Sequence, residues 1–157
     1  MDKVLKSFFV LSSCAGIAHA CNCREPKVEF KKDHSDVVFR GTIIELRDSD
    51  KAAGISAMWG RDTRKMAVFR VSRVWKGEVG QTFEMPAVEE TSMCLGFLPD
   101  ALMVGADLLI YADRVQVPGR ESEYYTSICG FHKSARSAHD LRKLGRGEEP
   151  LKPRNPI

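Results

Sequence analysis

The sequence predicts an all-β protein, a five-stranded, partly open Greek-key barrel of the OB type followed by one C-terminal helix. Most internal segments are rich in β-branched residues or alternate apolar and polar residues, and glycine-containing turns separate them. A sustained helical period occurs only near the C-terminus. We therefore place the barrel in residues 21–145, after a cleaved signal peptide (1–20) and before a flexible, proline-rich tail (146–157).

The first twenty residues have the pattern of a secretory signal peptide. Two lysines precede an apolar run over residues 8–17, and an Ala-His-Ala sequence closes the segment at residues 18–20. The apolar run is far shorter than the roughly 20 residues that a membrane-spanning helix needs, so we expect no membrane span. Cleavage at this site would make Cys21 the first residue of a secreted protein, either extracellular or periplasmic.

The same segment also permits a second interpretation, as a bacterial lipobox. Residues 11–14 read Leu-Ser-Ser-Cys, so that Cys14 would be lipidated and would become the mature terminus. This alternative leaves a short hydrophobic core and gives the Ala-His-Ala sequence no role. Without any cleavage, the segment would form an ordinary buried element.

Composition after cleavage favours one small domain. The chain has 157 residues and a net charge of +3, and removing the leader leaves 137 residues and a net charge of +2. This balance gives no reason to expect nucleic acid or an acidic membrane as a partner. We see no Ser-His-Asp arrangement and no paired carboxylates, so we predict no enzyme activity and no cofactor of the protein's own. We also expect the protein to be a monomer.

Five segments are predicted to form the strands. They cover residues 36–46, 66–75, 81–88, 104–115 and 123–129. Gly41 indicates a bend or bulge in the first strand, and the alternation of the second slips near Ser72, which indicates another bulge. Residues 104–115 are the most apolar and are expected at the centre of the sheet. Residues 48–64 lack a sustained period and are expected to form a long loop.

The predicted helix covers residues 134–144. Four apolar residues share one helical face: Ala135, Ala138, Leu141 and Leu144. Ser134 is expected to cap the N-terminus of the helix, and the glycines at 145 and 147 are expected to end it.

Four cysteines remain after cleavage, an even set that suits an oxidising compartment: Cys21, Cys23, Cys94 and Cys129. A bridge between the first two would close too tight a loop, and the residues alone leave the other two pairings open. Either pairing closes loops of roughly 70 to 110 residues, nominally worth ~4–5 kcal/mol in the chain-entropy model. Their spacing, with His132 nearby, does not match the usual zinc-ligand patterns. Since chain ends usually fray, a terminus held twice suggests a role for that terminus.

Several of these features together resemble the tissue inhibitors of metalloproteinases and the wider netrin-like modules. The likeness rests on the Cys-x-Cys directly after the signal peptide and on VVFRGTI, VFRVSRVWKG, TSMCLGF, GADLLIYA and SICGF. It covers residues 21–144 and implies an OB barrel with the disulfides Cys21–Cys94 and Cys23–Cys129. The animal inhibitors have twelve cysteines and a second subdomain, so this chain resembles a short, single-domain bacterial-type member.

The resemblance implies an inhibitor of zinc metalloendopeptidases. The α-amine and carbonyl of Cys21 would chelate the catalytic zinc of the protease, and the side chain of Asn22 would enter its main specificity pocket. Contacts with the protease would come from Asn22, Cys23, Thr91, Ser92, Met93, Cys94 and Leu95. The loop at 48–64 would add Met58-Trp59 as an apolar tip. The alternative is a netrin-like adhesion or ligand-binding module that does not inhibit, lipid-anchored if Cys14 is the terminus.

Overall fold

Six short-to-medium strands and two short α-helices make up the described part of the chain. The computed structural model describes residues 21–49, 65–89, 94–116, 119, 122–136 and 138–152. In chain order the elements are α1 (Val28–His34), β1 (Val37–Asp48), β2 (Lys65–Lys76), β3 (Thr82–Pro86), the 3-10 turn η1 (Pro99–Ala101), β4 (Asp107–Val115), β5 (Glu123–Tyr125), β6 (His132–Ser134) and α3 (Ala138–Leu144).

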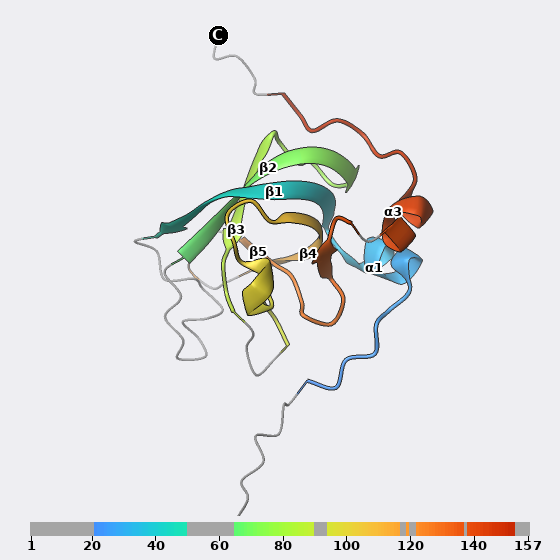
Figure 1. Ribbon diagram of the computed structural model, residues 1–157, viewed down its shortest axis with the longest axis horizontal. Helices are drawn as coiled ribbons and strands as arrows, with labels where there is room; N and C mark the ends of the chain where they lie inside the picture. Colours follow the sequence, from blue (N-terminus) through green and yellow to red (C-terminus); the bar gives the residue numbers. More distant parts are fainter. Residues whose placement is uncertain are drawn as a thin grey trace, which may run out of the picture.

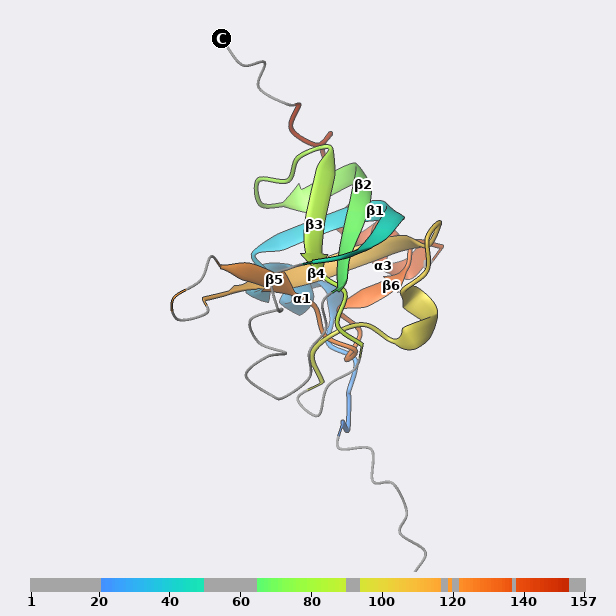
Figure 2. The same cartoon turned by 90° about the vertical axis from the view of Figure 1, so that its left-hand side faces the viewer.

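The strands form one curled antiparallel sheet (Figures 1 and 2). Its order is β3-β2-β1-β4-β5, and β6 also pairs with β4. The outermost strands, β3 and β5, approach each other, so the sheet has the form of a half-barrel. The prediction of a mostly β protein is confirmed. The apolar segment predicted at the centre is β4, which pairs with three strands, but the middle of the sheet order is occupied by β1.

Bulges in the β1–β2 ladder account for much of the curl. The register passes over Ser72 and Trp75 on β2 and over Ile44 on β1. Each extra residue increases the local twist, which bends the long ladder. The bulge predicted near Ser72 is confirmed, and Gly41 lies at the same register shift. A Cβ on Gly41 would lie 3.2 Å from the carbonyl oxygen of Arg70, so glycine permits the close approach of the two strands.

The two faces of the sheet bury separate apolar clusters. The larger cluster draws on β1 to β4, and its largest fully buried members are Phe39, Ile43, Phe69, Met85, Phe97 and Ile110. A smaller cluster on the other face consists of Val38, Leu109 and Tyr111, with Leu141 and Leu144 of α3 packed against it. The helix α3 therefore covers the outer face of the sheet, while most of the buried phenylalanines fill its inner face.

The C-terminal elements differ from the sequence prediction. The predicted strand at 123–129 is regular only over β5, because the chain then turns. Ser134 lies in β6, where it pairs with Leu108, and α3 begins at residue 138. The N-cap role predicted for Ser134 is therefore wrong. The helical spacing from Ala135 onward was misleading, because Ala135 is buried in the turn that links β6 to α3.

The helix α1 was not predicted. Only Val28 and Lys31 of its seven residues are buried, so it lacks an apolar stripe. Because Lys31 takes a buried position where an apolar residue is usual, the sequence of α1 looks like that of a polar turn.

Residues 146–152, which we expected to belong to a flexible tail, are partly paired with the barrel. Glu148 and Val74 exchange two backbone hydrogen bonds, at 2.9 and 2.7 Å. The backbone N–H of Leu151 donates to the carbonyl oxygen of Val79 at 2.9 Å. This stretch is therefore held along the end of β2, and residues 153–157 lie outside the described part of the chain.

Candidate functional site

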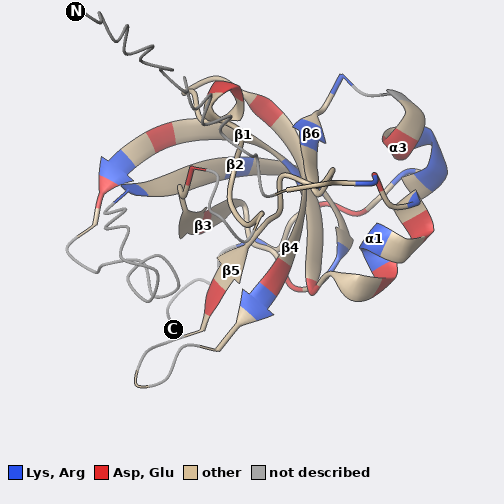
Figure 3. Cartoon of the chain, turned by 90° about the horizontal axis from the view of Figure 1, so that it is seen from below, with Lys and Arg blue, Asp and Glu red and all other residues tan. Residues whose placement is uncertain are grey.

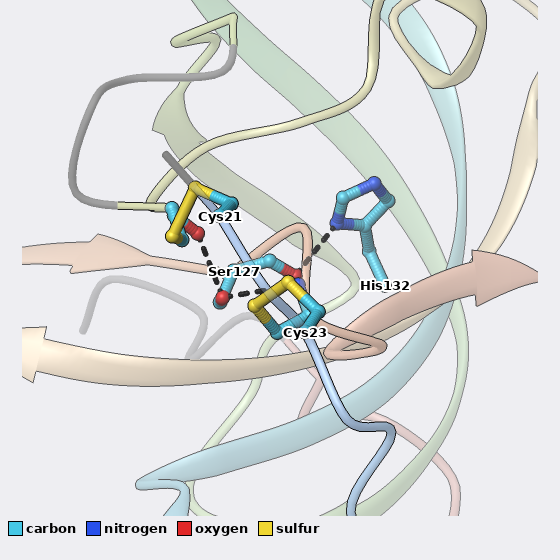
Figure 4. The surroundings of a disulfide bond; sticks show 6 residues. Cys21, Cys23, Ser127 and His132 are labelled. Carbon is cyan, nitrogen blue, oxygen red and sulfur yellow. Dashed lines mark hydrogen bonds between the residues drawn. A yellow bond between two sulfur atoms is a disulfide. The ribbon is translucent and has the colours of Figure 1, made fainter. Parts of the chain in front are cut away.

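Two disulfides fix the segment that begins at Cys21. Cys21 is bonded to Cys94 and Cys23 to Cys129, with Cα–Cα distances of 5.7 and 5.0 Å. These are the pairs that the resemblance implies, and they are confirmed. Figure 4 shows the two bridges close together, with Ser127 between them.

The predicted contact residues fall into two groups. Asn22 and Cys23 are exposed, whereas Cys94 and Leu95 are partly buried. The disulfides bring these four residues together, because they join residues 21–23 to residues 94 and 129. Thr91, Ser92 and Met93 lie outside the described residues, as do Met58 and Trp59.

The segment after Cys94 has an unusual backbone. Cys94 has a φ of 61°, in the left-handed region that non-glycine residues rarely adopt, and Gly96 has a φ of 109°. A Cβ on Gly96 would lie 2.4 Å from the carbonyl oxygen of Val88, so no other residue fits there without movement. The carbonyl oxygen of Cys94 accepts hydrogen bonds from Ser127 Oγ at 2.7 Å and from the N–H of Ile128 at 3.1 Å. The disulfide partner of Cys21 is thus held by its own backbone contacts.

His132 links the two segments that carry the disulfide partners (Figure 4). The N–H of Leu98 donates to Nε2 at 3.1 Å, and Nδ1 lies 3.2 Å from the carbonyl oxygen of Ser127. Because Nε2 accepts, we assign the proton of the neutral ring to Nδ1, which then donates to Ser127. Burial lowers the pKa of His132, although the hydrogen bond to Ser127 and the charge of Asp100 oppose this shift. The ring is therefore neutral at neutral pH, with both nitrogens engaged.

A buried ion pair lies beside this site and joins α1 to α3. Lys31 Nζ lies 2.5 Å from Asp140 Oδ2, and both side chains are 0% exposed. Lys31 also donates to the carbonyl oxygen of Gly130 at 3.1 Å, and the Tyr111 hydroxyl donates to Asp140 Oδ2 at 3.1 Å. Burial alone would raise the pKa of Asp140, but the hydrogen bond from Lys31 and other polar contacts lower it overall. The pair holds the two helices against the loop that follows Cys129.

Sequence reasoning gave no role to Ser127, His132 or Lys31. Their contacts connect residues that lie between 2 and 109 positions apart in the chain. A weak signal existed only for His132, which follows Cys129 by three residues.

The described ranges hold neither a cluster of metal ligands nor a membrane-spanning helix. There, no three side chains of His, Cys, Asp or Glu gather closely enough to hold a metal ion. Neither described helix has the length and apolarity needed to cross a membrane.

The chain matches none of the protein-family models and none of the curated proteins with which it was compared.

Proposed function

We propose that the mature protein is a secreted inhibitor of zinc metalloendopeptidases, a short relative of the tissue inhibitors of metalloproteinases in the netrin-like group. The observation that supports this most directly is the double disulfide anchorage of the segment from Cys21, which is half-buried, to the exposed Asn22 and Cys23. We further propose that the half-barrel is of the OB type, since β1 pairs with both β2 and β4 while β3 and β5 close the curl.

The proposed chemistry uses the α-amine that signal-peptide cleavage would create on Cys21. A catalytic zinc keeps one coordination position open for water or substrate. The amine nitrogen and carbonyl oxygen of one residue form a five-membered chelate, which would displace the zinc-bound water and remove the nucleophile. An α-amine has a pKa of about 7.7–8.0, so a useful neutral fraction exists near neutral pH.

Rigidity gives the anchored terminus its advantage. Ordering the backbone of one residue costs roughly 1–2 kcal/mol, so three residues ordered before binding would save about 3–6 kcal/mol. That saving corresponds to roughly a hundredfold to ten-thousandfold in affinity. Asn22, exposed between the two bridged cysteines, would point into the specificity pocket, flanked by Cys94 and Leu95.

The test begins with the natural terminus. Mass spectrometry of the exported protein should find Cys21 first and its amine unmodified. A terminus at Cys14, or an acylated amine on Cys21, would contradict the mechanism. The purified protein is then assayed against a panel of zinc endopeptidases.

A one-residue extension tests the chelation itself. One alanine added before Cys21 should abolish inhibition, because the α-amine then moves away from the chelating carbonyl. The matched control carries the same alanine directly after Ile157 instead, and should inhibit normally. Both variants should unfold at nearly the same temperature as the native protein. Equal inhibition by the N-terminally extended form would refute the proposal and leave the disulfides a purely structural role.

A further inference from the structure

Four charged side chains of alternating sign form a closed ring beside the disulfides. They come from the N-terminal segment, α1, β6 and α3, and they are Glu25, Lys31, Lys133 and Asp140. Figure 3 shows α1 and α3 next to each other, each with acidic and basic positions.

Each member of the ring lies close to two members of opposite charge. Glu25 Oε1 forms an ion pair with Lys133 and lies 3.6 Å from Lys31 Nζ. Asp140 Oδ2 lies 2.5 Å from Lys31 Nζ, and its Oδ1 lies 3.6 Å from Lys133 Nζ. Two carboxylates and two ammonium groups thus balance to zero charge.

The four residues differ in burial, so the ring has a buried base, Lys31 and Asp140, and a more exposed rim, Lys133 and Glu25. Lys31 and Asp140 are fully buried, whereas Lys133 is 21% exposed and Glu25 is 55% exposed. The base joins the helices, and its loss would leave a charge without compensation inside the protein. The rim is accessible to water, which can solvate Lys133 when Glu25 is changed. The contribution of Glu25 to global stability is therefore small.

Glu25 is also held by its contact with the disulfide loop. It follows Cys23 by two residues, and its Cγ would lie 3.0 Å from a Cβ built on Gly130, the residue after Cys129. Its pKa is lowered, first by the hydrogen bond from Lys133, so it is ionised at neutral pH.

The disulfides fix two points of the N-terminal segment, and Glu25 supplies a third. Between Cys23 and α1 the residues Arg24 and Lys27 are exposed, and the ion pairs of Glu25 attach this stretch to α1 and β6. We propose that Glu25, held by Lys133 and Lys31, is a positioning residue that sets the orientation of Cys21 to Arg24. This inference rests on the proposed function, since the orientation matters where the segment enters a protease.

The test compares Glu25→Gln with Glu29→Gln in the mature protein. Glu29 makes the control because it is an exposed glutamate of α1 that pairs with Lys143, outside the ring, at 3.3 Å. Two quantities are measured: the ¹⁵N relaxation of the backbone amides of Asn22, Cys23 and Arg24, and the inhibition constant against the most sensitive protease of the panel.

We expect Glu25→Gln to increase the fast motion of these three amides and to weaken inhibition about three- to tenfold. Its unfolding temperature should stay within a few degrees of the native value, and Glu29→Gln should behave as the native protein. In the native protein, raising the salt to about 1 M should bring the inhibition constant toward that of Glu25→Gln, because salt screens exposed ion pairs.

The outcomes separate this inference from the proposed function. If the native protein inhibits no protease, the proposed function fails, while the amide relaxation still decides whether Glu25 holds the segment. If Glu25→Gln leaves the relaxation unchanged, the positioning role is refuted. If it loosens the amides without weakening inhibition by a protein that does inhibit, the link between orientation and binding is refuted.

Discussion

Replacing Asp140 with asparagine should destabilise the protein strongly, because it leaves the buried charge of Lys31 without its carboxylate partner. The side-chain amide oxygen of the new residue can still accept the hydrogen bond from Tyr111, but the ammonium group of Lys31 loses the carboxylate at 2.5 Å. What remains near Lys31 is the carbonyl oxygen of Gly130, the ring of Tyr111 and the more exposed Glu25. Removing one partner of a fully buried pair costs about 3–5 kcal/mol.

Removing both charges should restore most of that loss. Methionine at position 31 has nearly the length of lysine, and asparagine at position 140 still accepts the Tyr111 hydroxyl. We therefore expect the double variant Lys31→Met with Asp140→Asn to lie within about 1–2 kcal/mol of the native protein. The coupling between the two changes should be at least about 2 kcal/mol.

Urea unfolding of the native protein, Lys31→Met, Asp140→Asn and the double variant measures this coupling, provided that the slope of the transition is unchanged. A double variant as unstable as Asp140→Asn alone would refute the reasoning, because the cost would then not come from an unpaired charge.

The pH dependence gives a second check. The pKa of Asp140 is below its ordinary value, so its contribution is present above about pH 4 and is lost as the pH falls further. Asp140→Asn should lack that loss.

Two further predictions concern the segment after Cys94. The pKa of His132 is lowered in the folded state, so its contribution is present above the unfolded value of about 6.5 and is lost as the pH falls. The urea midpoint of the native protein should decrease between about pH 7 and about pH 5. His132→Gln should lack this decrease, because glutamine can still accept from the N–H of Leu98 and donate to the carbonyl oxygen of Ser127 but does not titrate. If the variant had the same pH profile as the native protein, the decrease would not come from His132. Gly96→Ala should destabilise the protein by at least about 2 kcal/mol more than Gly105→Ala in the same urea assay. Both glycines have a positive φ, but nothing lies within 4 Å of a Cβ on Gly105, whereas the Val88 carbonyl is 2.4 Å from one on Gly96. Equal losses would show that backbone strain alone determines the effect.

Local patterns predicted those parts of the fold that local interactions determine. The slip in alternation at Ser72 indicated the bulge, and the β-branched segments indicated β1 and β2. In contrast, β6 has three residues and exists because residues 132–134 pair with β4. No pattern within three residues could predict such a strand, and its absence from the prediction moved the expected helix start back to Ser134.

The disulfides were the only part of the candidate site that could be predicted from the sequence. The Cys-x-Cys sequence and the family resemblance together indicated the pairs Cys21–Cys94 and Cys23–Cys129. The buried role of Lys31 could not be predicted, since its partner Asp140 is 109 positions away in the chain. A lysine in a polar segment is usually exposed, and only the folded structure brings the compensating carboxylate to it.

The described ends of the chain lie on opposite sides of the molecule. In Figures 1 and 2 the stretch at 21–27 lies on one side of the barrel and the stretch at 145–152 on the other. A fusion tag or a surface linker attached beyond residue 152 would therefore point away from Cys21. Immobilising the protein through that end presents its bridged segment uniformly to solution, which suits biosensor measurements and the capture of proteases from culture medium.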